Sequence, residues 1–202
     1  MEFESILNNL TLEKEYAKAN FVPIIRQKSA KFLYDFIKTN QFKTILEIGT
    51  AIGFSGSIII GAGVERLITI DINEHYLKMA KETFSKFGIL DKIEILCGDA
   101  FDYIKKFDKE NRKFDMIFLD GAKGQYITYL PILARLLNKN GVIFADNVLL
   151  HGMVESKEII PHKKRTMVVN LRKYLDAINS APYETELVRL EDGIAITRLK
   201  GD

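Results

Sequence analysis

The 202-residue sequence holds a single cysteine, Cys97, which excludes an internal disulfide framework. One cysteine suits a reducing compartment, so we expect a cytoplasmic protein. Cys97 follows an apolar run, and we expect it to be a small buried residue. No stretch of 18 or more apolar residues occurs, so we expect no membrane span. The first residues lack a basic start and an apolar core, so we expect no signal peptide.

Neither sign of charge dominates, because 29 lysines and arginines face 27 acidic residues and leave a net charge of +2. Any polyanion partner must therefore be argued from local clusters of charge. Hydrophobic residues make up 47% of the chain, which is typical of a globular protein. No repeat and no linker rich in proline, glycine or serine is present. We therefore expect one domain over residues 1–202, with N-terminal helices over 1–40 and a core over 41–202.

Strand and helix patterns alternate along most of the core. The predicted strands cover residues 44–48, 67–71, 92–97, 114–120 and 141–146. The predicted helices start near 55 and cover 73–87, 100–106, 125–137 and 162–179. Before them, residues 4–20 predict one or two polar helices, and a further helix is predicted to start at Pro23. This alternation predicts a parallel sheet that helices cover on both faces.

The C-terminal part departs from that alternation. Residues 183–190 and 194–200 both have strand character, and Glu191-Asp192-Gly193 between them indicates a hairpin. We therefore predict an α/β protein with a doubly wound, mostly parallel seven-stranded sheet that ends in an antiparallel hairpin. By analogy of fold, this ending is typical of the Rossmann-like class I methyltransferases that use S-adenosylmethionine (SAM).

Residues 45–53 predict a buried strand that runs into a glycine turn. Gly49 and Gly53 do not form the G-x-G-x-x-G pattern that brings a backbone close to a pyrophosphate. The turn therefore suits a cofactor without phosphate. At the start of the next helix, Ser55 could bind a carboxylate of that cofactor, and Glu47 in the strand could meet its amino group.

Two further acidic residues follow strands in this half of the chain. Asp71 ends the second predicted strand, where a carboxylate can bind the hydroxyls of a ribose. Asp99 lies after the third strand in Gly98-Asp99-Ala100 and could reach an adenine edge. The alternative is that both residues only cap helices, a common role for aspartate.

The second half of the chain places oxygen ligands at strand ends. Asp120 ends the fourth strand, and Asp146 and Asn147 end the fifth. Neighbouring strand ends lie about 5 Å apart, so these side chains can converge. Two carboxylates and an amide oxygen suit Mg²⁺, completed by water and substrate. The alternative is a pair of solvated strand-end aspartates beside an asparagine in a turn.

Two segments resemble the cation-dependent O-methyltransferases, the group that acts on catechols and caffeoyl-CoA. They are residues 118–123 (Phe-Leu-Asp-Gly-Ala-Lys) and 145–148 (Ala-Asp-Asn-Val), and the resemblance extends over residues 20–200. It implies SAM and Mg²⁺ as cofactors and a homodimer. By this resemblance the metal ligands would be Asp120, Asp146 and Asn147, with Lys123 as the nearby base and Asp120 beside it in the catalytic site. The SAM site would include Glu47, Gly49, Ser55, Asp71, Asp99, Ala100 and Asp120.

A closer resemblance is to the bacterial tRNA 5-hydroxyuridine methyltransferases of the TrmR type. It lies in residues 122–126, in residues 146–149 with Gly152, and in residues 190–196. It implies methylation of the wobble base in the tRNA anticodon loop to 5-methoxyuridine, because that base also offers two adjacent oxygens. The alternative is a small-molecule enzyme of the catechol or caffeoyl-CoA type. The absence of tryptophan counts mildly against a catechol pocket.

A basic run entering the last long helix fits an RNA partner. The candidate phosphate contacts are Lys163, Lys164, Arg165 and Arg172, with the arginines expected to face outward. The alternative is a solvated helix face. His151 is expected at the rim of the site, and Tyr126 either stacks on a base or belongs to the core.

Overall fold

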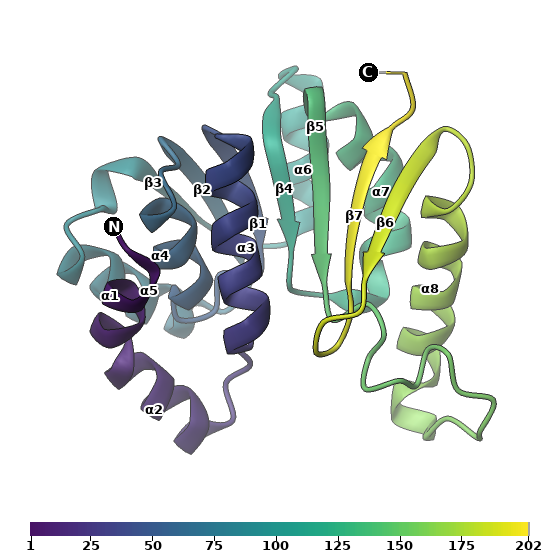
Figure 1. The fold of residues 1–202 in the computed structure, drawn as a ribbon, viewed down its shortest axis with the longest axis horizontal. Coiled ribbons are helices and arrows are strands. Elements are labelled where there is room, and N and C mark those ends of the chain that lie inside the picture. The colour runs from purple at the N-terminus through teal and green to yellow at the C-terminus, as the bar shows by residue number, and fades with distance from the viewer. Residues whose placement is uncertain (202) are drawn as a thin grey trace. The chain divides into compact units, whose positions relative to one another are not determined.

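A computed structural model describes residues 1–201 of the chain (Figure 1). The chain divides into two compact units, Met1–Ala100 and Phe101–Asp202, and each unit has its own strands and helices. The expected single domain therefore stays a prediction. None of the helices among residues 1–201 is long and apolar enough to cross a membrane.

The first unit combines three parallel strands with five helices and a short 3-10 turn among its described residues. The strands are β1 (Thr44–Ile48), β2 (Arg66–Asp71) and β3 (Ile93–Cys97), in the order β3-β2-β1. The helices are α1 (Phe3–Asn9), α2 (Thr11–Asn20), α3 (Gln27–Asn40), α4 (Phe54–Gly61) and α5 (Glu74–Lys86), and the 3-10 turn is η1 (Leu90–Lys92). Because the strands are parallel, their carboxyl ends lie on one edge.

Two sequence expectations for this unit are wrong. Helix α3 begins at Gln27, whereas the sequence predicted a start at Pro23, because residues 22–26 are irregular and Arg26 is extended. Ile25 is nevertheless buried, as are apolar residues of α3. Its position in the sequence therefore continued the apolar spacing of that helix although the residue lies before it. Cys97 is exposed, whereas the sequence predicted burial, because it ends the outer strand of this unit. An apolar run cannot reveal that its strand has a neighbour on one side only.

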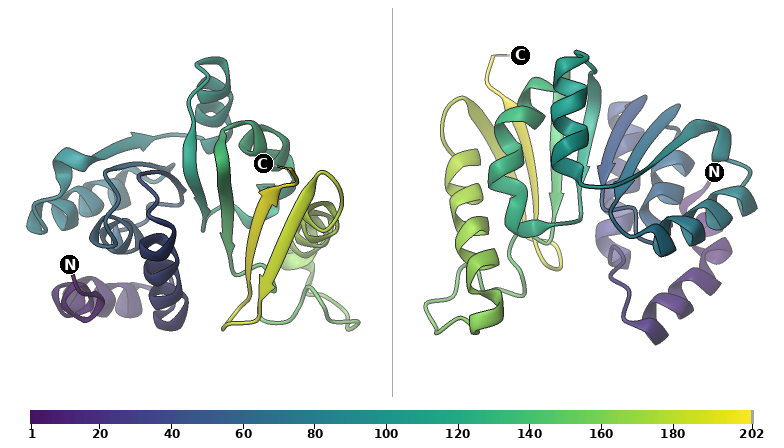
Figure 2. Two further views of the ribbon diagram at one scale, coloured as in Figure 1. Left: turned by 45° about the horizontal axis from the view of Figure 1, so that its top comes forward. Right: turned by 180° about the vertical axis from the view of Figure 1, so that it is seen from behind.

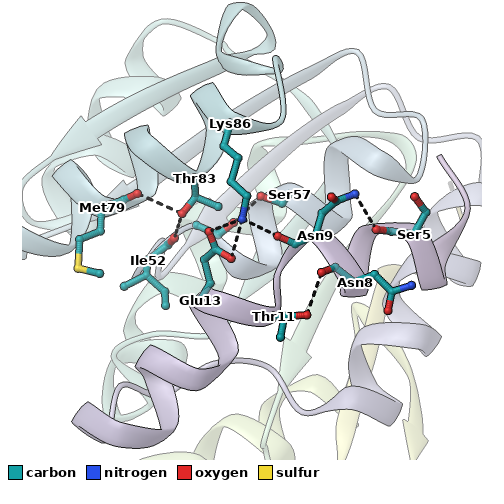
Figure 3. Close-up of polar contacts among 11 residues, drawn as sticks. Ser5, Asn8, Asn9, Thr11, Glu13, Ile52, Ser57, Met79, Thr83 and Lys86 are labelled. Atoms are coloured by element: carbon teal, nitrogen blue, oxygen red, sulfur yellow. Dashed lines mark hydrogen bonds and ion pairs between the residues drawn. The ribbon is translucent and has the colours of Figure 1, made fainter.

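The N-terminal helices pack firmly on the first unit. Ile6 of α1 is fully buried, and its Cδ1 fills the space beside Gly61 of α4. The Lys86 Nζ of α5 donates to the Asn9 carbonyl over 2.7 Å and to Glu13 over 3.2 Å, as Figure 3 shows. Helices α1 and α2 are therefore part of the packed unit, and only a glycine fits where Ile6 meets α4.

Among its described residues, up to position 201, the second unit combines four strands with three helices. The strands are β4 (Phe114–Leu119), β5 (Leu137–Asp146), β6 (Tyr183–Val188) and β7 (Ile194–Leu199). The helices are α6 (Ala100–Lys109), α7 (Tyr126–Arg135) and α8 (His162–Ile178), with a 3-10 turn η2 (Lys123–Gln125). Strand β4 pairs parallel to β5, and β7 pairs antiparallel to both β5 and β6. The three helices lie on one face of these strands (Figure 2).

The strand order β3-β2-β1-β4-β5-β7-β6 confirms the predicted α/β class, the mostly parallel seven-stranded sheet and the C-terminal hairpin. Strand β5 begins at Leu137, four residues before the predicted start at Gly141. Leu137 pairs with Phe114, and the register with β4 shifts between Phe114 and Met116. The polar residues 138–140 lie at this irregularity, so the apolar pattern did not reveal them as part of the strand. Helix α7 accordingly ends at Arg135 instead of 137.

We expect Ile6→Ala to lower the free energy of unfolding by about 2 to 5 kcal/mol, because it removes a fully buried side chain and leaves a cavity against α4. The control Leu12→Ala removes an exposed side chain and should change stability by no more than about 0.5 kcal/mol. Urea denaturation followed by circular dichroism measures both. Equal effects of the two substitutions would show that α1 does not contribute to the stable core.

Candidate cofactor and metal sites

The glycine turn after β1 has a backbone that only glycine suits. Gly49 has a φ of 108° and Gly53 a φ of 81°. A Cβ on Gly53 would lie 2.9 Å from the Phe84 ring and 3.1 Å from the Ala80 backbone. The turn can therefore approach α5 closely, and the first residues of α4 that follow it are buried.

Glu47 is fully buried at the end of β1 and is held by two hydroxyl groups. Ser55 Oγ donates to its Oε1 over 2.5 Å, and Thr69 Oγ1 donates to its Oε2 over 2.6 Å. Because the single proton of Thr69 goes to Glu47, the 2.6 Å contact between the hydroxyls of Thr50 and Thr69 has Thr50 as donor. The Ser55 hydroxyl is likewise committed to Glu47. A cofactor carboxylate would therefore have to use other donors than the Ser55 proton.

Asp71 joins the glycine turn to the end of β2. Its Oδ2 accepts a hydrogen bond from the Ala51 backbone N–H and its Oδ1 accepts one from the Asn73 N–H, each over 2.9 Å. The cap of α5 is Asn73, so Asp71 is not that cap. Each carboxylate oxygen can still accept a second hydrogen bond, so the ribose role stays a prediction. Asp99 is exposed directly before α6, and Ala100 begins that helix.

The predicted metal ligands lie together within the second unit. Leu119 and Ala145 are register partners in the parallel β4–β5 pair, so Asp120 and Asp146 are neighbours at the end of these strands. Asp146 is fully buried. Neither of its oxygens makes a hydrogen bond of normal geometry within residues 1–201, although the Asn147 backbone is near enough to lower its pKa. Asn147 itself turns the chain with a φ of 56°.

The electrostatics of this site favour a cation. Burial, and then the charge of Asp120, raise the pKa of Asp146 to about 7 against the lowering effect of Lys123. Burial also raises the pKa of Asp120, against the opposing effect of Lys123. Lys123 already pairs with the partly buried Asp120, whereas the buried Asp146 lacks such a partner among the described residues, so a cation beside Asp146 would stabilise its charged form. Among residues 1–201 no group of three or more His, Cys, Asp or Glu side chains could hold a metal ion. The predicted set of two carboxylates and the Asn147 amide therefore stays a prediction.

Lys123 lies in η2, directly after the β4 end. Its Nζ is 3.0 Å from Asp120 Oδ1, and 16% of its side chain is exposed. The Lys123 ammonium therefore lies at the candidate metal site, beside Asp120, and is mostly shielded from solvent. Its proposed role as a base stays a prediction.

The hairpin turn between β6 and β7 fixes the loop that follows Asn147. The Val148 N–H donates to the Gly193 carbonyl and the Leu149 N–H to the Asp192 carbonyl, each over 3.0 Å. The buried Asp192 carboxylate accepts the His151 backbone N–H and lies 3.3 Å from His151 Nδ1. From the sequence Asp192 was expected only as a turn residue, since its partner His151 is 41 residues away. The His151 side chain is 56% exposed, and its position at the rim of the site stays a prediction.

The basic run and Arg172 differ in their surroundings. Lys163, Lys164 and Arg165 are all exposed at the start of α8. Arg172 is half-buried and donates to the carbonyls of Val154, Met153 and Ser156 over 2.8, 3.3 and 2.7 Å. The expectation that Arg172 faces outward is therefore wrong, because the guanidinium holds the loop before α8 against that helix.

Tyr126 belongs to the core of the second unit. It is fully buried, and its ring meets the Tyr174 ring edge-on at a centroid distance of 5.5 Å. Of the two expected roles, the core role is confirmed and stacking on a base is wrong. The aromatic type alone did not distinguish them.

Comparisons of sequence and of fold relate this chain to known O-methyltransferases. A family model described as O-methyltransferase matches residues 3–200. A catechol O-methyltransferase from Niastella koreensis is 32% identical over 64% of this chain and 60% of its own length. A solved structure of a candidate caffeoyl-CoA O-methyltransferase from Staphylococcus aureus is 30% identical, with a TM-score of 0.85 over 94% of this chain and 91% of that one. The fold is also that of the TomG O-methyltransferase from Streptomyces achromogenes in complex with SAM, at 22% identity and a TM-score of 0.83 over 100% of this chain and 92% of that one.

The curated relatives are longer than the part that this chain matches. The match spans 60% of the Niastella koreensis catechol O-methyltransferase and 58% of another from Mycobacterium tuberculosis.

Gly193→Ala should destabilise the protein more than Gly152→Ala. Both glycines have positive φ, so each substitution costs about 1 to 2 kcal/mol of backbone strain. A Cβ at residue 193 would also lie 2.4 Å from Leu149 Cγ, which adds about 1 to 3 kcal/mol of overpacking. A Cβ at residue 152 meets nothing within 4 Å in the described chain. Urea denaturation measures the difference, and equal losses would mean that Leu149 yields without cost.

Proposed function

Because the chain belongs to the O-methyltransferase family, we propose that it is a SAM- and Mg²⁺-dependent O-methyltransferase. The observation that carries the metal requirement is the Asp146 carboxylate, which is fully buried and lacks a hydrogen-bond partner among residues 1–201, beside the acidic Asp120. A protein that only binds SAM has no need for these paired charges.

The proposed metal ligands are Asp120, Asp146 and Asn147. When bound there, Mg²⁺ would supply Lewis-acid polarisation of two adjacent acceptor oxygens. Lys123, whose Nζ lies beside Asp120, would as a neutral amine take the proton of the acceptor hydroxyl, or as an ammonium stabilise its oxyanion. The acceptor oxygen then bonds to the methyl carbon as the carbon–sulfur bond breaks, and the products are a methyl ether, S-adenosylhomocysteine and a proton.

The glycine turn and the strand ends of the first unit are the proposed SAM site. SAM carries no phosphate, which suits a turn without the dinucleotide glycine pattern. The Asp71 carboxylate can accept hydrogen bonds from ribose hydroxyls, and the exposed Asp99 can accept one from the adenine amino group. Gly49, Ser55 and Ala100 would line the same site, with Glu47 fixing Ser55 from within.

The proposed acceptor is 5-hydroxyuridine at the wobble position of tRNA. Its support is the motif resemblance together with the exposed run of Lys163, Lys164 and Arg165. These cations occupy the first turn of α8, which holds no acidic residue there. The amino end of a helix carries a partial positive charge, so cations placed there are unfavourable on their own. A bound phosphate would be attracted both by the helix dipole and by these cations. A catechol or caffeoyl-CoA acceptor is the second candidate, favoured by the activities named for the relatives.

The deciding experiment is methyl transfer from labelled SAM, with and without EDTA, to tRNA carrying 5-hydroxyuridine and to a simple catechol. We expect label on the tRNA, lost with EDTA and restored by Mg²⁺. Label on the catechol alone would refute the RNA substrate and retain the enzyme class. Transfer that persists in EDTA would refute the metal requirement.

We expect Asp146→Asn to reduce methyl transfer about 100-fold or more, since the cation contributes several kcal/mol to the transition state. SAM affinity, measured by calorimetry, should stay near that of the wild type. Asp176→Asn, at an exposed position of α8, is the matched control and should retain activity. Full activity in Asp146→Asn would reject the metal site.

Replacing Lys163, Lys164 and Arg165 with glutamine should lower tRNA affinity and reduce the salt dependence of binding by a slope of about 1 per residue. The control replaces the exposed Lys105, Lys106 and Lys109 of α6, which removes the same charge. Filter binding over a salt series measures both. An equal loss in the two variants would mean that net charge, and not this helix, governs binding.

A further inference from the structure

Tyr126, the first residue of α7, has a buried hydroxyl that the proposed methyl transfer does not use. The side chain is fully buried, and within residues 1–201 its Oη makes no hydrogen bond. A buried hydroxyl without a partner costs stability compared with phenylalanine at the same place. A tyrosine here therefore needs a reason other than packing.

The chain leads directly from the candidate metal site to this residue. Asp120 follows β4, Lys123 in η2 pairs with it over 3.0 Å, and Tyr126 begins α7 three residues later. Helix α7 packs on β5, the strand that ends in Asp146. The edge-on contact with Tyr174 fixes the Tyr126 ring.

The hydroxyl lies within the electrostatic field of both carboxylates. Burial, then the charge of Asp120, and also the charge of Asp146 hold the pKa of Tyr126 well above its ordinary value. The group is therefore a hydrogen-bond donor at any physiological pH. Both Asp146 oxygens are acceptors without a partner among residues 1–201. Two packed elements, α7 and β5, thus carry a buried donor and a buried acceptor that both lack partners among the described residues.

We propose that Tyr126 is a positioning residue for the divalent cation, whose hydroxyl donates a hydrogen bond to the Asp146 carboxylate when the site is loaded. This inference rests on the proposed function, because it requires a cation at Asp120, Asp146 and Asn147. Outer groups that hydrogen-bond a ligating carboxylate fix its orientation and strengthen metal binding. Tyr126 would not contact the reacting atoms.

The test is Tyr126→Phe, with Mn²⁺ affinity measured by titration of the electron paramagnetic resonance signal of the free ion. We expect binding to weaken about 10- to 100-fold, the effect of losing a group that orients a metal ligand. The metal-free variant should unfold at an equal or higher urea concentration, because the removed hydroxyl had no partner. Methyl transfer should recover at high Mn²⁺.

Tyr174→Phe is the matched control, because it makes the same chemical change in the ring that touches Tyr126. Tyr174 is also fully buried, and its hydroxyl makes no hydrogen bond of normal geometry within residues 1–201, although Thr197 is near enough to lower its pKa. Burial is the main cause that raises the pKa of Tyr174, and neither Asp120 nor Asp146 contributes. We expect its Mn²⁺ affinity to equal that of the wild type.

Three results would overturn the proposal. Unchanged Mn²⁺ affinity in Tyr126→Phe would leave its hydroxyl without a role, and equal weakening in both tyrosine variants would assign the effect to ring packing. A wild type that binds Mn²⁺ no better than Asp146→Asn would remove the metal site as well. The last result identifies failure of the proposed function, since the first two require a wild type that binds the ion.

Discussion

The candidate metal site depends on the parallel pairing of β4 and β5. Their register opposes Leu119 to Ala145, so the residues that follow, Asp120 and Asp146, must be neighbours at one edge. Side chains alternate between the faces of a strand, so a slip of one residue would turn either acid away from the other. The pairing of two apolar strands, which has no chemistry of its own, therefore determines whether two acids can share an ion.

This arrangement costs stability in the absence of a ligand. Asp146 lies buried with a raised pKa and the charge of Asp120 beside it. The following loop has three successive residues with positive φ, at positions 150–152. Hydrogen bonds from that loop to the hairpin turn near Asp192 stabilise it. Backbone strain and buried acids with raised pKa values concentrate at sites that bind or react.

Much of the fold and the strand-end acids followed from the sequence, because both depend on local patterns. Strand periodicity located β1 to β5 and placed Asp71, Asp120 and Asp146 at their ends. Features that depend on distant partners did not follow. The exposure of Cys97 depends on the order of the strands in the sheet. The burial of Arg172 depends on its hydrogen bonds to carbonyls 16 to 19 residues away. The role of Asp192 depends on its hydrogen bond to His151, 41 residues away. No local pattern carries that information.

Asp71 has a consequence for the thermodynamics of ligand binding. Its two oxygens already hold the backbone N–H groups of Ala51 and Asn73, so one carboxylate ties the glycine turn to the next helix before any ligand arrives. A preorganised turn loses little conformational entropy on binding, so more of the contact energy can appear as affinity. With the proposed ribose contact added, an exchange of Asp71 for another acceptor would alter both ligand binding and the shape of the glycine turn.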